Sequence, residues 1–491
     1  MESRFGTRRV GPAKAIALWS LAGALQWAPA ALAAEDDDLA ALLDEHIVSG
    51  ASKTGELAKD APATTSVITS EEINRYGIRS LAEAINFLGM GLNTQDPLHS
   101  TEIGGRGVLL TADFGNHVLL VVDGHVFNEP WDGTAYFEQA AGVPLEMIDH
   151  IELILGPGSV LYGGNAMIAV INIVTKRDAA NKGVHLLASG GVSPQQGRNG
   201  NFTSFAPANL GGSYRLSAVL DHDLPWGEHG QIHLGADFYR QSGPSFEWGP
   251  QTVSNDDGTP YNFGPRATPG VWGGRIEHQY NTTIPSLYGR LQIGDLSIMF
   301  RAEMYRRATP VQGFDQQNTD FDENRSWERD RWVSLDIQYD KRLSRQLNLS
   351  VRGYADAYDY YQQTYNSEPS ACGVPSSGPC LFEVNGHSRW VGAELQASYD
   401  WTDQDRYTTL VGLNGTLRGV GSETDSLGAL SADDLDALGA LHGGAGAFDE
   451  FNAVEVQGVQ GKRDVTEGIW AAYIQQRLTP TNFLHLNLGA R

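Results

Sequence analysis

The chain has 491 residues and a formal net charge of −24, and 41% of its residues are hydrophobic. This length predicts more than one domain. A strongly acidic chain repels the phosphates of nucleic acids, so the charge argues against nucleic acid as a partner. Beyond the amino terminus, no stretch is apolar over the roughly 20 residues that a membrane-spanning helix needs. Because 57 residues are glycine and the chain is polar overall, any role in a membrane is expected to come from strands.

Residues 1–33 have the pattern of a secretory signal peptide. Four basic residues precede an apolar run over 15–30, and Ala31-Leu32-Ala33 offers the small side chains that signal peptidase requires. Arg8-Arg9 could instead begin a twin-arginine signal, but the apolar pair expected after it is missing, which favours ordinary export. The mature chain is therefore expected to begin near Ala34.

The next region, residues 61–178, is predicted to fold as a compact domain with two buried strands. Residues 118–122 form a continuous apolar run that ends at Asp123-Gly124, a dipeptide that favours a tight hairpin turn. Residues 168–174 form the second apolar run, and a glycine-rich stretch precedes it. Packing explains these glycines better than a phosphate-binding loop, because no Gly-Lys-Ser/Thr follows them.

Four blocks of this region resemble, in order and approximate spacing, the plug domain of TonB-dependent outer-membrane receptors. The blocks are Thr65-to-Ile73 (TSVITSEEI), Gly105-Arg106-Gly107, residues 116–124 (NHVLLVVDG) and residues 148–176. The resemblance implies an α+β plug domain followed by an antiparallel transmembrane β-barrel in the outer membrane, in contact with its lipid. It also implies structural roles in the plug for Arg106, Asp123 and Gly124.

Two positions depart from the family pattern. A usual Gly-Gly before the Val-Ile-Asn-Ile run is Ile168-Ala169 here, a change that concerns only local packing. The family usually has arginine immediately before Gly-Pro, where this chain has Leu155. An ion pair between plug and barrel is therefore not expected at that position.

The resemblance further implies a protein partner. A short segment before the plug docks onto the energy-coupling protein TonB by adding a strand to its sheet. Within the polar segment 34–60, the best candidate is β-prone and consists of Glu45, His46, Ile47 and Val48, followed by Ser-Gly. The same residues could equally serve as a linker into the plug.

Ligands of such receptors meet the outward tips of the plug, which the resemblance places at residues 93–104 and 127–138. The side chains there that are best suited to hydrogen-bond or stack on a polar ligand are Asp96, His99, Trp131, Asp132 and Tyr136. The implied function is energy-coupled uptake of a scarce nutrient, most commonly a ferric siderophore. Cobalamin, haem and oligosaccharide uptake share the fold, so the substrate is an analogy. A plugged surface barrel that acts as a receptor or adhesin without transport is the alternative, and an enzyme ranks third because Gly-x-Ser-x-Gly is absent.

From about Val184 onward, the hydrophobic pattern changes to a period of two. Apolar and polar residues alternate along 296–304, 333–340, 347–352, 391–399 and 484–490, as expected of strands with one apolar face. Short turns at 294–295, 343–345, 402–406 and 479–481 are predicted to alternate with long polar loops at 307–330, 362–386 and 419–466. Outer-membrane barrels have this asymmetry, with short periplasmic turns and long extracellular loops. A soluble β-sandwich is the alternative.

The alternating segments number about eleven, which is half of the roughly 22 strands of plugged transporters. The chain ends in Arg491, where the family resemblance leads one to expect an aromatic residue. Residues 179–491 are therefore predicted to form an incomplete barrel that belongs to a longer receptor.

Both cysteines, Cys372 and Cys380, fall in the predicted loop 362–386. An even pair in an exported protein suggests one disulfide that closes a surface loop, with two free thiols as the alternative. Two thiols alone do not make a structural zinc site, and the histidines do not fall at metal-ligand spacing. Neither a metal nor a cofactor is expected.

Overall fold

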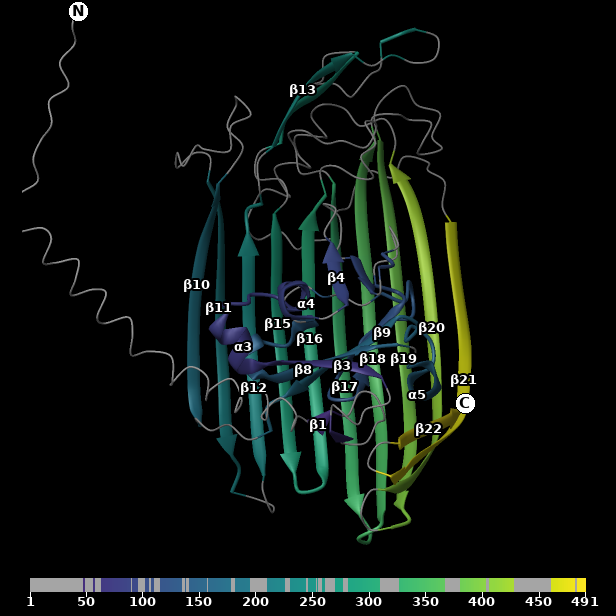
Figure 1. Ribbon diagram of the computed structural model, residues 1–491. Helices are drawn as coiled ribbons and strands as arrows, with labels where there is room; N and C mark the ends of the chain where they lie inside the picture. The colour runs from purple at the N-terminus through teal and green to yellow at the C-terminus, as the bar shows by residue number, and fades with distance from the viewer. Residues whose placement is uncertain are drawn as a thin grey trace, which may run out of the picture.

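The computed structural model describes residues 47–48, 56–57, 63–89, 91–95, 102–105, 107–109, 115–134, 137, 141–156, 158–177, 182–194, 210–225, 230–243, 246–252, 254, 258–260, 270–276, 281–309, 326–366, 380–402, 406–427, 461–481 and 484–491. Within these residues, a small amino-terminal domain lies against the inner face of a large curved sheet (Figure 1). The predicted signal peptide, residues 1–33, lies outside the described residues. None of the described helices is long and apolar enough to cross a membrane.

A five-stranded sheet forms the centre of the amino-terminal domain, which we call the plug. Its spatial order is β3-β8-β9-β6-β7, and only the β6–β9 pair is parallel. The strands are β3 (Thr64–Thr69), β6 (Val118–Val122), β7 (His125–Val126), β8 (Ile148–Leu155) and β9 (Ala169–Thr175). All five residues of β6 are buried, as are most of those in β9, so both predicted buried strands are confirmed.

The predicted turn at Asp123-Gly124 is also confirmed. Val122 pairs with His125, which leaves a two-residue loop between β6 and β7. The loop has φ of 48° at Asp123 and 84° at Gly124. Two consecutive positive φ values define the turn type whose twist matches that of the flanking strands, and Asp-Gly is a preferred pair for it.

Short helices and paired segments complete the plug. The helix α3 (Ser70–Arg75) begins at a capping box, in which Thr69 and Glu72 each satisfy a backbone N–H of the other. The helix α4 (Leu81–Leu88) begins at Ser80, whose hydroxyl accepts from the Glu83 N–H. The remaining elements are the strand pairs β1 (Ile47–Val48) with β2 (Glu56–Leu57) and β4 (Leu92–Gln95) with β5 (Glu102–Gly105), the 3-10 turn η4 (Leu145–Met147) and α5 (Ser159–Tyr162).

The large sheet has eleven antiparallel strands, which confirms the number predicted from the alternation. They follow one another in chain order except that β12 pairs with β15. The intervening β13 (Phe246–Thr252) and β14 (Val271–Ile276) form a separate pair, and β13 lies beyond the end of the sheet (Figure 1). The eleven strands are β10 (Gly183–Pro194), β11 (Leu210–Asp223), β12 (Gln231–Gln241), β15 (Thr282–Ile293), β16 (Leu296–Ala308), β17 (Trp327–Arg342), β18 (Leu347–Asn366), β19 (Cys380–Asp400), β20 (Tyr407–Leu427), β21 (Gly461–Thr481) and β22 (Leu484–Ala490).

The two faces of this sheet differ as the alternation predicts. In β17, Val333, Leu335 and Ile337 are exposed on the outer face, whereas their neighbours Ser334 and Asp336 are buried on the face toward the plug. The outer face therefore suits lipid, and the inner face holds the polar and charged side chains. This is the arrangement of a transmembrane barrel wall.

The predicted connections need two corrections. The strand β21 continues to Thr481, so the turn predicted at 479–481 is wrong, and the ladder with β22 is irregular between Leu478 and Thr481. The paired strands also extend well into the loops predicted at 362–386 and 419–466. The backbone ladder continues there, although a regular alternation of apolar and polar residues does not.

Candidate functional site

The plug is held in place by polar contacts that converge on the β6–β7 turn. Asp123 is buried, and its carboxylate lies 2.6 Å from Nη1 of Arg290 in β15. It also accepts from the backbone and side chain of Thr175, at 3.0 and 2.6 Å, and from the Tyr288 hydroxyl at 3.1 Å. Burial alone would raise the pKa of Asp123, but the Arg290 guanidinium outweighs it and the pKa lies below its ordinary value. The plug and the wall are therefore joined by an ionised pair.

The residue after the turn, His125, makes a second connection. Its Nε2 lies 2.9 Å from Oδ1 of Asp356 in β18, and its Nδ1 lies 3.3 Å from Oδ2 of Asp336 in β17. Burial lowers the pKa of this imidazole, but the two carboxylates more than compensate and raise it to about 9. His125 is thus a cation at neutral pH, enclosed between two strands of the wall.

Arg352 in β18 makes the third connection. Its guanidinium donates to the backbone carbonyls of Asp123, at 2.8 Å, and of Gly124. It also donates to Oε1 of Gln338 at 2.6 Å, and its Nε lies 3.2 Å from Oδ2 of Asp336. The charge of Arg352 is balanced by Asp336 within the wall. Its contacts with the plug are hydrogen bonds to backbone carbonyls, which carry no net charge.

A fourth connection lies at η4, on the other side of the plug. Both guanidinium nitrogens of Arg215 in β11 donate to the Glu146 carboxylate at 2.8 Å, and its Nε donates to Asp237 at 2.6 Å. Such bidentate pairs fix the relative orientation of the two side chains and also neutralise their charges. Leu155 is buried in the plug core, and the ion pairs described between plug and wall involve other positions.

The loop after β7 is organised by one buried carboxylate. The Glu129 oxygens accept from the backbone N–H groups of Trp131 at 2.5 Å, Asp132 at 3.0 Å and Thr134 at 3.3 Å, and from the Thr134 hydroxyl at 2.9 Å. Burial raises the pKa of Glu129 to about 7 although these donors favour the charged form. The loop is therefore built around a carboxylate that titrates near neutral pH.

This loop presents Trp131 to an aromatic part of the wall. The indole stacks on Tyr360 with ring centroids 4.9 Å apart, and Tyr358 lies 6.4 Å away. A side chain on Gly386 would place its Cβ 2.7 Å from Cδ2 of Trp131, so the glycine makes room for the indole. These rings belong to one cluster with buried Trp332 and Trp390. Stacking surfaces with hydroxyl and indole N–H groups suit ligands that are both planar and polar.

Only part of the predicted ligand site falls within the described residues. Trp131 is half-buried in the aromatic cluster, and Asp132 is exposed beside it, with its carbonyl accepting from Asn116 at 3.0 Å. The other predicted ligand residues, Asp96, His99 and Tyr136, lie outside the described part of the chain. Tyr358 and Tyr360 were not predicted, because alternation in β18 marks them only as strand residues.

Several other predictions also concern residues outside the described ranges, namely Glu45, His46, Arg106 and Cys372. Ile47 and Val48 form β1, and Cys380 begins β19, but the surroundings of their side chains are not described. Within the described residues, no group of three or more His, Cys, Asp or Glu side chains could hold a metal ion.

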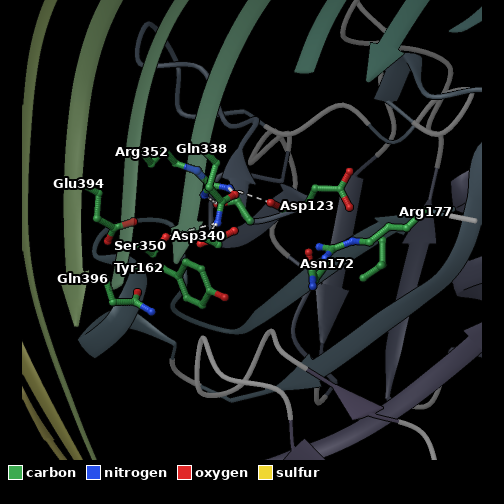
Figure 2. Close-up of a pocket in the computed structure, with 12 residues that line it drawn as sticks. Asp123, Tyr162, Asn172, Arg177, Gln338, Asp340, Ser350, Arg352, Glu394 and Gln396 are labelled. Atoms are coloured by element: carbon green, nitrogen blue, oxygen red, sulfur yellow. Dashed lines mark hydrogen bonds between the residues drawn. The ribbon is translucent and has the colours of Figure 1, made fainter. Parts of the chain in front are cut away.

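A polar cavity of about 370 Å³ lies between the plug and strands β17–β19 (Figure 2). Its plug side includes the Asp123-Gly124 turn, Tyr162 and Asn172. On the wall, Asp340, Ser350, Arg352 and Glu394 are among the residues that line it. The Arg352 guanidinium reaches across one border of the cavity to the turn, as Figure 2 shows.

Comparison with known proteins agrees with this architecture. The family model of the TonB-dependent receptor plug domain matches residues 58–170, the segment that contains the plug sheet up to β9. Residues 58–170 are thus identified as a TonB-dependent receptor plug domain. This assignment confirms the resemblance seen in the sequence, and it places the receptor in the outer membrane, with an α+β plug against a barrel wall of antiparallel strands.

Two relatives and one solved structure illustrate the extent of the similarity. A vitamin B12 transporter of Vibrio vulnificus is 26% identical over 182 residues, which is 36% of this chain and 28% of that protein. An iron-regulated outer membrane virulence protein of Vibrio cholerae is 32% identical over 139 residues, which is 28% of this chain and 20% of that protein. The P. aeruginosa receptor FpvA has the same fold, with a TM-score of 0.59 at 13% identity over 90% of this chain and 53% of that chain. The chain thus spans only part of the length of the proteins that it matches.

Proposed function

We propose that this receptor takes up a scarce nutrient across the outer membrane by energy-coupled transport, and that its substrate is a ferric siderophore. The observation that carries the proposal is the plug held inside the wall by a buried ion pair at Asp123 and a partly buried one at Glu146. A plug held by such pairs separates from the wall only when energy is supplied, because a buried charge that loses its partner is strongly destabilised. An energy-coupling protein is therefore part of the proposal.

The aromatic cluster around Trp131 supports ligand binding above the plug. The loop that carries Trp131 is fixed by Glu129, so the indole is held in one position before a ligand arrives. A preformed site loses little conformational freedom on binding, which favours affinity. The predicted ligand residues Trp131 and Asp132 lie in this loop and are part of the proposed site.

The proposed docking segment is Glu45 to Val48. Ile47 and Val48 pair with Leu57 and Glu56 as short antiparallel strands, so the backbone of the segment is compatible with strand pairing. This geometry supports docking onto TonB by strand addition, in which an extended segment joins the edge of a partner sheet.

The names of the relatives support two candidate substrates. The Vibrio cholerae relative is named for iron regulation, which favours an iron chelate. The Vibrio vulnificus relative is named as a vitamin B12 transporter, so cobalamin is the second candidate. The aromatic cluster fits either ligand, and a direct comparison of the two is needed.

Uptake and surface binding should be measured separately in whole cells that express the receptor, with a panel of labelled ferric siderophores and with labelled cobalamin. Deletion of residues 45–50 is expected to abolish uptake while surface binding remains, and deletion of residues 36–41 serves as the control of equal length. Trp131→Ala is expected to weaken binding about fivefold, since loss of one stacked aromatic contact removes about 1 kcal/mol. Binding without uptake by the unmodified receptor would favour the receptor or adhesin alternative, and uptake of cobalamin alone would refute the siderophore.

A further inference from the structure

We propose that a cluster of arginines on the outer face of the wall binds the phosphate groups of a lipid in the outer leaflet of the membrane. The arginine cluster consists of Arg240 in β12, Arg306 in β16, and Arg329 and Arg331 in β17. It lies on the opposite face of the wall from the plug. The proposed lipid site is therefore separate from the transport proposed above.

Strand pairing brings the cluster together. Arg306 lies directly opposite Arg329, and Arg331 is two residues farther along the same strand. Thr283 in β15 is opposite Arg306 on one side and Arg240 on the other. Residues directly opposite one another in a ladder point to the same face of the sheet. Three strands thus contribute arginines to one patch, in which the charges of Arg240 and Arg329 act on Arg306.

The patch lies where the apolar part of the outer face ends. In β17, exposed Val333 and Leu335 share their face with the two arginines near the start of the strand. In β12, exposed Leu234 likewise shares its face with Arg240 near the end of the strand. The connection 309–326 adjoins the patch at the upper edge of the wall in Figure 1, and outer-membrane barrels have such long connections on the extracellular side. The arginines therefore lie at the level of the outer-leaflet headgroups.

Aromatic rings support two of the guanidinium groups. Cζ of Arg306 lies 4.9 Å from the centroid of the Trp327 ring. Cζ of Arg329 lies 5.9 Å from the same centroid and 5.7 Å from that of Tyr361. The Tyr361 hydroxyl donates to Glu383 at 2.8 Å, which places one carboxylate at the edge of the cluster. Rings stabilise cations over their faces, and Trp and Tyr are typical of the membrane–water interface. The guanidinium groups are therefore held at the depth of the interface.

The positive charge of the cluster is not balanced by the described side chains of the wall. Among these residues, neither Arg240 nor Arg306 forms an ion pair. Asp359 lies opposite Arg331, but its Oδ1 is 2.6 Å from Nη2 of Arg389 and is thus already paired. Like charges directly opposite one another destabilise a sheet, and a charge beside lipid is costly without a counter-charge. An anion that bridges the opposed arginines would remove both costs.

A phosphorylated lipid matches both parts of this surface. Guanidinium groups donate two parallel hydrogen bonds to a phosphate, a geometry that lysine lacks. The acyl chains of the same molecule would cover the exposed apolar residues beside the arginines, such as Val333 and Leu335. Free phosphate would contact the cluster alone. The surface therefore favours a lipid that carries phosphate in its headgroup.

The test is the affinity of the purified receptor for diphosphoryl lipid A in dodecyl maltoside micelles, measured by native mass spectrometry. The same lipid without its phosphates and inorganic phosphate at equal concentration are the comparison ligands. The variant Arg306→Gln/Arg329→Gln removes the opposed pair of arginines. The matched control is Arg389→Gln, because Arg389 is on the same outer face and its charge is balanced by Asp359.

The double variant is expected to bind the phosphorylated lipid about tenfold more weakly, whereas Arg389→Gln should stay within about twofold of wild type. Removal of the phosphates should weaken binding to wild type about tenfold and change binding to the double variant by less than about twofold. Because the double variant removes two facing charges of like sign, its melting temperature without lipid should not fall below that of wild type. The comparison of the two lipids uses wild type, so it does not depend on how the variants fold.

Other outcomes would overturn the inference. Equal binding of the two lipids by wild type would show that the phosphates are not recognised. An equal loss of affinity for both lipids in the double variant would mean that the arginines do not contact the phosphates. Displacement of the lipid by inorganic phosphate at equal concentration would identify a site for the free ion instead. None of these results depends on transport, so the proposed function is tested separately.

Discussion

The enclosure of His125 predicts a specific dependence of plug stability on pH. The two wall carboxylates, Asp336 and Asp356, raise the pKa of the imidazole from 6.5 to about 9 against the opposing effect of burial. A raised pKa in the folded state stabilises the fold fully below the unfolded value, and the contribution disappears as the pH rises through the folded value. The stabilising contribution of His125 is therefore lost between about pH 6.5 and about pH 9.

The size of this contribution to the free energy of unfolding follows from the shift in the pKa of His125. Each pKa unit corresponds to about 1.4 kcal/mol, so the contribution is about 3 kcal/mol at pH 6. It falls to about 2 kcal/mol at pH 7.5 and is nearly absent at pH 10. Replacement by the neutral His125→Gln also leaves two buried carboxylates short of a partner, a loss that typically costs about 3 to 5 kcal/mol.

The measurement is the free energy of plug unfolding in urea, followed by pulse proteolysis of the purified receptor in detergent at pH 6, 7.5 and 10. The free energy of unfolding of wild type minus that of His125→Gln should decrease by about 3 kcal/mol from pH 6 to pH 10. The double variant His125→Gln/Asp356→Asn should recover part of the loss, and His185→Gln, at an exposed position in β10, serves as the surface control. A difference that does not vary with pH would refute the reasoning.

Three further predictions concern other residues. Burial raises the pKa of Glu129 from 4.5 to about 7, so its contribution to stability is present below pH 4.5 and disappears as the pH rises through 7. The urea midpoint of wild type relative to Glu129→Gln should therefore fall between pH 4 and pH 8, and a constant difference would contradict this. Asp123→Ala should destabilise the plug by about 3 to 5 kcal/mol, because Arg290 is left buried without its carboxylate. Asp123→Asn retains a side-chain acceptor and should cost less, so equal losses in the two variants would argue against this account of the pair. Thiol labelling of the denatured, unreduced protein should find neither Cys372 nor Cys380 free, and two labelled cysteines would exclude the disulfide.

Local sequence signals were sufficient for some of the elements of this receptor. The apolar runs at 118–122 and 168–174, and the Asp-Gly turn between β6 and β7, are each encoded within a few residues, and all three form as expected. The period of two gave the correct number of strands, because each must present one face to lipid and one to the lumen. The same signal failed where β18 to β21 extend into the predicted loops, since apolar and polar residues do not alternate regularly there.

The contacts that give the site its chemistry depend on tertiary structure. His125 meets Asp356 across 231 positions of sequence, and Arg352 meets Gly124 across 228. Which strand residues face which plug residues depends on the placement of the plug inside the wall, and no local pattern records it. Glu129 is an example of what the sequence does not predict, because in the sequence it is only an acidic loop residue. The fold buries its carboxylate at the centre of the loop and turns the backbone N–H groups of Asp132 and Thr134 toward it.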